Sequence, residues 1–145
     1  TQKCFDLAWL KRNGLPESYK SQKLTAGFVQ ANIMEKLTPT NASWNGHNSS
    51  GWKTDLLAVN GFDERMQYGG QDRELGERLF NHGIKSIQIR YSAICLHLDH
   101  ERGYKNTESI EKNKAIRKNT KTTKSDFTDY GVVKNSVEES STSSS

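Results

Sequence analysis

The sequence predicts an α/β fold, followed by a basic helix and a disordered polar tail. Apolar residues alternate with polar ones along Ile84 to Leu98, which is typical of a half-buried strand. The stretch Gln71 to His82 places Leu75 and Leu79 four residues apart, as in a helix with one core-facing side. Because only 32% of the 145 residues are hydrophobic, the chain is expected to hold one modest core.

The first third of the chain gives the weakest signals. Residues 1–23 are polar and are interrupted by Gly14 and Pro16, which indicates a loop. Residues 24–37 fit either a helix or a strand, and the aromatic and β-branched content of Gly27 to Ala31 favours a strand. We therefore expect residues 1–45 to form a linker region; that it is variable and lies on the acceptor side is implied by the family resemblance described below.

A polar turn and a short helix come next. Gly46 and Asn48 lie in the turn, where glycine tolerates a positive φ and asparagine can bond backbone or ligand. The following residues predict a helix from Trp52 to Val59 that ends at a left-handed Gly61. Four side chains of this segment are expected in the core: Trp52, Leu56, Leu57 and Val59.

Two further turns precede the second helix. In the first, Phe62 is expected to anchor the chain in the core, and Asp63 is expected to bond its own backbone. In the second, Gly69 and Gly70 permit positive φ and a close approach to a ligand, directly before Asp72 in the first helical turn. An aspartate there can act simply as a cap, but capping does not require two glycines.

Within the second helix, Glu74 can reach the mouth of an active site or pair with Arg78 one turn later, and the pairing is favoured. Gly83 is expected to end the helix. The predicted strand then leads to His97, Asp99 and His100. Imidazole and carboxylate groups at a strand end suit a divalent cation such as Mn²⁺ or Mg²⁺. Histidines in this position are also compatible with surface or core packing.

The segment from Gly46 to His100 resembles the C-terminal half of the catalytic domain of family 2 glycosyltransferases of the GT-A type, a Rossmann-like fold. It is also similar to the galactosyltransferase C-terminal module. The matching motifs are the Gly46-His47-Asn48 turn, NGFDE at Asn60 to Glu64, GGQD at Gly69 to Asp72, and the strand that ends in histidine.

The resemblance implies a role for each matching residue. Asp72 would be the general base that takes the proton of the acceptor hydroxyl, and His97 or His100 would bind Mn²⁺ or Mg²⁺. Gln71 departs from the family's usual glutamate and cannot ionise, so it would bond the acceptor or brace the loop. The remaining expected substrate contacts are Gly46, Asn48, Gly69, Gly70 and, for the donor diphosphate, Arg102, Tyr104 and Lys105.

The implied reaction is a metal-dependent, inverting sugar transfer from a nucleotide-sugar donor to a glycan hydroxyl, in surface polysaccharide or lipid-linked glycan synthesis. The family holds its donor on an upstream half that carries a D-x-D motif, which this sequence lacks. We therefore expect an incomplete transferase that needs an N-terminal half of the same protein. Residues 46–100 would be its catalytic subdomain, residues 101–124 a basic helical segment, and residues 125–145 a flexible Ser-rich tail.

Two other functional classes are compatible with parts of the sequence. A catalytically inactive carbohydrate-binding or regulatory module on the same fold is favoured by Gln71 and by the missing D-x-D motif. Nucleic-acid binding is suggested by the net charge of +4, but the basic residues are not interleaved with aromatic ones, so no nucleic-acid partner is expected.

Location is inferred from composition. No apolar stretch is long enough for a membrane span, and the basic segment is compatible with peripheral contact with anionic lipids. Cys4 and Cys95 lack metal-site spacing, which fits a reducing compartment, and Cys95 is expected to be buried on its strand. We expect a cytoplasmic protein, at or near the inner face of the cell membrane.

Overall fold

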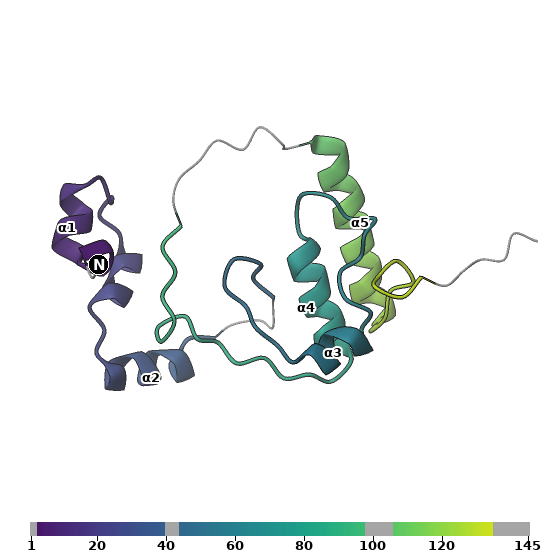
Figure 1. The fold of residues 1–145 in the computed structure, drawn as a ribbon, viewed down its shortest axis with the longest axis horizontal. Coiled ribbons are helices and arrows are strands. Elements are labelled where there is room, and N and C mark those ends of the chain that lie inside the picture. The colour runs from purple at the N-terminus through teal and green to yellow at the C-terminus, as the bar shows by residue number, and fades with distance from the viewer. Residues whose placement is uncertain (1–2, 40–43, 98–105, 135–145) are drawn as a thin grey trace, which may run out of the picture. The chain divides into compact units, whose positions relative to one another are not determined.

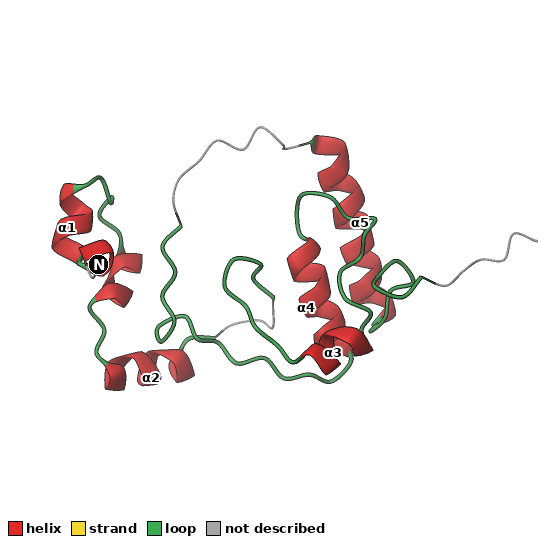
Figure 2. Ribbon diagram, in the orientation of Figure 1, coloured by secondary structure: helices red, strands yellow, loops and turns green. Residues whose placement is uncertain are grey.

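A computed structural model describes residues 3–39, 44–97 and 106–134 (Figure 1), together with the backbone but not the side chains of residues 19, 20 and 22. Helices dominate these residues, and Figure 2 shows no strand among them. An isolated antiparallel bridge between Tyr130 and Lys134 is the only β-type pairing among these residues. The elements are η1 (Lys3–Phe5), α1 (Leu7–Arg12), η2 (Tyr19–Leu24), α2 (Phe28–Leu37), α3 (Lys53–Ala58), α4 (Gln71–Asn81) and α5 (Thr107–Thr123).

The predicted α/β fold, and with it the Rossmann-like GT-A half, is therefore wrong for the described residues. Residues 84–97 form an irregular segment with a turn in which the Ala93 amide donates to the Ile89 carbonyl at 2.8 Å. Alternation alone does not make a strand, because a strand needs a neighbour to bond its backbone and cover its apolar side. The described residues supply neither, and the side chain of Ile87 is 87% exposed. Cys95 is likewise exposed.

The chain divides into two compact units, which are described separately. The first comprises Thr1–Asn41 and Ile87–Asp99. Here residues 28–37 form helix α2, so the strand favoured at Gly27 to Ala31 is wrong. The Glu35 side chain of α2 accepts hydrogen bonds from the backbone amides of Tyr91 and Ser92, at 3.1 and 2.9 Å. A helix side chain thus ties the irregular segment to α2.

The second unit comprises Ala42–Ser86 and His100–Ser145, and its core is small. Three buried residues of α4 and the end of α3 form it, with partly buried side chains packed around them. Helix α4 matches its prediction closely, and Gly83 follows it with a φ of 93°. The buried set is Val59, Leu75 and Leu79, and the surrounding set is Trp44, Leu56 and Ile84.

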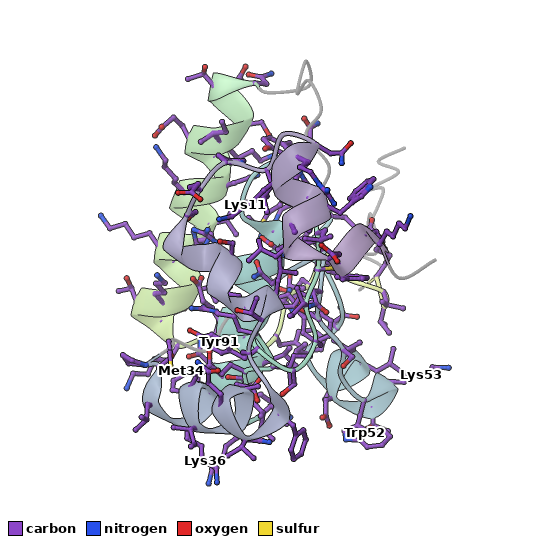
Figure 3. The ribbon with its side chains drawn as sticks, turned by 90° about the vertical axis from the view of Figure 1, so that its left-hand side faces the viewer. Lys11, Met34, Lys36, Trp52, Lys53 and Tyr91 are labelled. Carbon is purple, nitrogen blue, oxygen red and sulfur yellow. The ribbon has the colours of Figure 1, made fainter. Side chains whose placement is uncertain are left out.

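Several side chains expected in this core are outside it. Trp52 is 78% exposed and Phe62 is 45% exposed. Figure 3 shows Trp52 and Lys53 pointing outward at the start of α3. Helix α3 has only six residues, so only a narrow face of it can pack against α4. Leu57, which was also expected in the core, lies on the exposed face.

Helix α5 lies beside α4 (Figure 1), and its residues fall within the segment 101–124 for which a basic helix was expected. The Asn106 side chain caps it by accepting a hydrogen bond from the Glu108 amide at 2.9 Å. The residues that α5 buries are polar: Ser109, Asn113 and Thr120. Specific hydrogen bonds, rather than an apolar stripe, therefore join α5 to the unit.

Residues 125–134, which we expected to belong to a flexible tail, pack against the NGFDE turn. The Asn60 side chain donates to the carbonyl oxygens of Thr128 and Val133, at 2.7 and 2.9 Å, and accepts from the Val133 amide at 2.7 Å. The Asn60 carbonyl also accepts from the Val132 amide at 3.0 Å. We call residues 125–134 the C-terminal strap. The rest of the predicted tail, residues 135–145, lies outside the described residues.

Candidate functional site

The candidate site is built around the turn Tyr68 to Gly70, which leads into α4. Gly69 and Gly70 have φ angles of 109° and 90°, in the left-handed region that favours glycine. The Gln71 side-chain oxygen accepts a hydrogen bond from the Gly69 amide at 3.0 Å. Gln71 thus braces the turn, one of the two roles expected for it from the sequence.

Asp72 lies in the first turn of α4 and meets the Gly46 turn. One carboxylate oxygen of Asp72 accepts from its neighbour, the Arg73 amide, at 2.8 Å. The other accepts from the Gly46 amide at 3.2 Å, across 26 residues of sequence. A Cβ atom on Gly46 would lie 3.5 Å from the Cβ of Asp72, so the two backbones approach closely. Asn48 belongs to the same turn, where its amide donates to the Asn45 carbonyl at 2.9 Å.

The structure therefore gathers one set of predicted residues in the second unit. Asp72 is the acidic member, and it is partly exposed, so its carboxylate remains accessible to a ligand. The described members of the set are Gly46, Asn48, Gly69, Gly70, Gln71 and Asp72. Apart from Asp72, these residues offer backbone and amide groups, which suit recognition of hydroxyl groups.

Helix α5 contacts the turn Tyr68 to Gly70, a contact that was not expected from the sequence. The Asn113 side chain donates to the carbonyl oxygens of Tyr68 and Gly69, both at 3.0 Å, and is fully buried. The Arg117 side chain lies against Gly70, where an added Cβ atom would be 3.1 Å from the arginine Cδ. One sequence feature could have indicated this contact. Asn113 follows Ser109 by four residues and precedes Thr120 by seven, so these three polar side chains share one face of the helix.

A buried ion pair fixes α4 beneath the site. The side chains of Glu74 and Arg78 are each 1% exposed and pair at 2.8 Å, which confirms the expected i, i+4 salt bridge. Arg78 also donates to the carbonyl oxygens of Val59 and Gly61, the latter at 2.7 Å. Glu74 accepts in addition from the Thr120 hydroxyl at 2.9 Å. These contacts tie α4 to the end of α3 and to α5.

The NGFDE turn is a scaffold, as expected from the sequence for Asp63. The Asp63 carboxylate accepts from the Arg65 amide at 3.0 Å, from the Arg65 guanidinium, and from the Thr128 hydroxyl at 2.8 Å. Burial raises the pKa of Asp63, but the hydrogen bonds from Arg65 and Thr128 outweigh this, so the pKa lies below its ordinary value. The Arg65 guanidinium also stacks on the Tyr130 ring at 3.8 Å.

Of the predicted metal and diphosphate residues, His97 alone is among the described residues. His97 is exposed and belongs to the first unit, whereas Asp72 belongs to the second, so their convergence stays a prediction. His100, Arg102, Tyr104 and Lys105 lie outside the described residues. Within residues 3–39, 44–97 and 106–134, no group of three or more His, Cys, Asp or Glu side chains could hold a metal ion.

Comparison with known proteins adds no assignment. No protein-family model, curated protein or solved structure matches this chain. In the part of the chain that the structure describes, none of the helices combines the length and apolar character needed to cross a bilayer. The case for function therefore rests on the residues themselves.

Proposed function

We propose that this chain forms the acceptor side of a glycosyltransferase site, in which Asp72 is the general base. One observation carries the proposal: the Gly46 turn and Asp72, 26 residues apart, meet through a hydrogen bond of 3.2 Å. Two of the sequence motifs that resemble the family, the Gly46 turn and GGQD, thus meet at one carboxylate. A structural capping aspartate would need only the amides of its own helix.

The proposed chemistry uses the lone pairs that the two backbone contacts leave available. Each carboxylate oxygen of Asp72 accepts one amide hydrogen and keeps room for a second. An acceptor hydroxyl would give its proton to Asp72 while its oxygen forms a bond to the anomeric carbon of the donor sugar. The bond from that carbon to the diphosphate breaks, the diphosphate leaves with the electron pair, and the configuration inverts.

The donor side of the proposal rests on the sequence alone. His97, with His100, would hold Mn²⁺ or Mg²⁺, which would neutralise charge on the diphosphate, and the donor itself would require a D-x-D region that this sequence does not contain. We propose a cytoplasmic activity at the inner membrane face, in surface polysaccharide or lipid-linked glycan synthesis. No catalytic step is assigned to these histidines.

A second candidate is a carbohydrate-binding or regulatory module without catalysis. The hydrogen bond from the Gly69 amide to the Gln71 side chain favours this candidate. It gives Gln71 a structural role in the turn, where the resembled enzymes have an ionisable glutamate. Both candidates place a glycan at the same turn. Turnover of a nucleotide-sugar donor distinguishes them.

The test replaces Asp72 by asparagine in the longest natural polypeptide that contains this sequence, assayed for sugar transfer with Mn²⁺. Asparagine can still accept one amide hydrogen but cannot take a proton, so kcat is expected to fall by about 10²–10⁴-fold with donor binding retained. Asp55→Asn, a change on α3, is the matched control and is expected to leave kcat unchanged.

Full turnover by Asp72→Asn would overturn the base assignment. Glycan binding without any turnover by the wild-type protein would favour the module instead. Circular dichroism of both variants checks that they are folded.

A further inference from the structure

Four cationic side chains gather on one face of α5, and one of them, that of Arg117, lies against the turn Tyr68 to Gly70. Together with Thr122 they line a depression of about 390 Å³. Spacings of three and four residues place them in one stripe along the helix. We call this stripe the α5 basic face; it consists of Lys114, Arg117, Lys118 and Lys121.

The charge of the α5 basic face is only partly balanced. Glu77 pairs with Arg117 at 2.5 Å and with Lys121 at 3.3 Å, and Glu111 pairs with Lys114 at 2.7 Å. Four positive charges thus face two negative ones, which leaves an excess of two. Like charges three or four residues apart destabilise a helix. An arrangement of this kind is stabilised by an anion that binds to it.

The helix macrodipole accounts for only one of these cations. Its effect is confined to the last turn of a helix, which in α5 contains Lys121. Lys114, Arg117 and Lys118 lie further from the helix end. Their positions therefore require another explanation.

The depression adjoins the candidate site through Arg117. The aliphatic part of this side chain lies against Gly70, two residues before Asp72, and its Nε atom is buried without a hydrogen-bond partner in the described structure. Since Gly70 has no side chain, the arginine can lie close to the turn. A guanidinium flanked by lysines is the donor arrangement that recognises phosphate oxygens.

We propose that the α5 basic face binds a small, soluble, multiply charged phosphate such as inorganic pyrophosphate. A membrane surface is the less suitable occupant, because none of the large hydrophobic side chains exposed in the described residues belongs to α5. A compact, multiply charged anion fits both the depression and the excess of positive charge. The proposal does not depend on the transferase assignment, since it concerns binding and not turnover.

The test is a calorimetric titration of the full chain with inorganic pyrophosphate at low ionic strength. The variant Lys114→Gln/Lys118→Gln removes two charges from the α5 basic face, and the matched control Lys53→Gln/Lys85→Gln removes two exposed lysines that do not line the depression. We expect saturable binding by the wild-type chain, a loss of affinity of about tenfold or more in the first variant, and little change in the control.

Two outcomes would overturn the proposal. Equal weakening in both variants would mean that pyrophosphate responds only to net charge. Absence of saturable binding in the titration would exclude a soluble diphosphate. If the chain then co-sediments with phosphatidylserine vesicles, the α5 basic face is assigned to lipid headgroups. Far-ultraviolet circular dichroism verifies that α5 is retained in each variant.

Discussion

Replacing Arg78 by methionine is expected to lower the free energy of unfolding by about 3–5 kcal/mol. The side chains of Arg78 and Glu74 are each 1% exposed, so the substitution leaves a carboxylate in the interior without its counter-charge. The Thr120 hydroxyl would still donate to Glu74, but the carbonyl oxygens of Val59 and Gly61 would lose their guanidinium donor. Since small domains are stable by about 5–15 kcal/mol, this is a large part of the total.

Two controls make the Arg78 experiment specific. Arg73→Met changes an exposed arginine on the same helix and is expected to alter stability by about 0.5 kcal/mol or less. The double variant Glu74→Met/Arg78→Met removes both charges and should be more stable than Arg78→Met alone, because no charge is left unpaired. Urea unfolding followed by circular dichroism measures all three. A loss below about 1 kcal/mol for Arg78→Met would refute the role of the pair.

Two further predictions concern backbone and charge. Gly70→Ala should cost about 1–2 kcal/mol through its left-handed φ, and at least as much as Gly83→Ala, which has a similar φ but open space around it. If urea unfolding shows that Gly70→Ala loses less free energy of unfolding than Gly83→Ala, the contact between Gly70 and Arg117 is contradicted. Because the folded pKa of Asp63 is lowered, its stabilisation is complete above its unfolded pKa of about 3.9 and is lost as the pH falls through the folded value. Asp63→Asn should flatten the acid limb of stability against pH, and an unchanged limb would exclude this carboxylate as its source.

Local signals predicted those parts of the fold that depend on neighbouring residues. The Leu75 and Leu79 spacing identified α4, the glycine at position 83 identified its end, and the basic run identified α5. The Glu74–Arg78 pair also follows from helix spacing. Each of these features is decided within one or two helical turns, so the sequence alone is sufficient.

The features that sequence analysis missed depend on partners distant in the chain. The alternation in residues 84–97 indicated a strand, but a strand exists only beside another, and the described residues contain none. Phe62 and Trp52 are apolar, yet the small core leaves them exposed. The role of Asn113 was missed because its acceptors, the carbonyl oxygens of residues 68 and 69, lie more than forty positions away.

The candidate site was predictable in part for the same reason. The two glycines and Asp72 are adjacent in sequence, so their turn follows from composition. The meeting of Gly46 with Asp72 was expected only from the resemblance. Arg117 gave no such signal, since its place against Gly70 depends on how α5 packs.

The C-terminal strap also sets a limit on how this polypeptide can be shortened. Gly131 fits against the NGFDE turn so closely that a Cβ atom there would lie 1.7 Å from the Asn60 carbonyl oxygen, a distance that no side chain can occupy. Removing everything after α5 as dispensable sequence would deprive Asn60 and Asp63 of partners that complete their turn. Shortened versions made for crystallisation or labelling should therefore extend at least to Lys134.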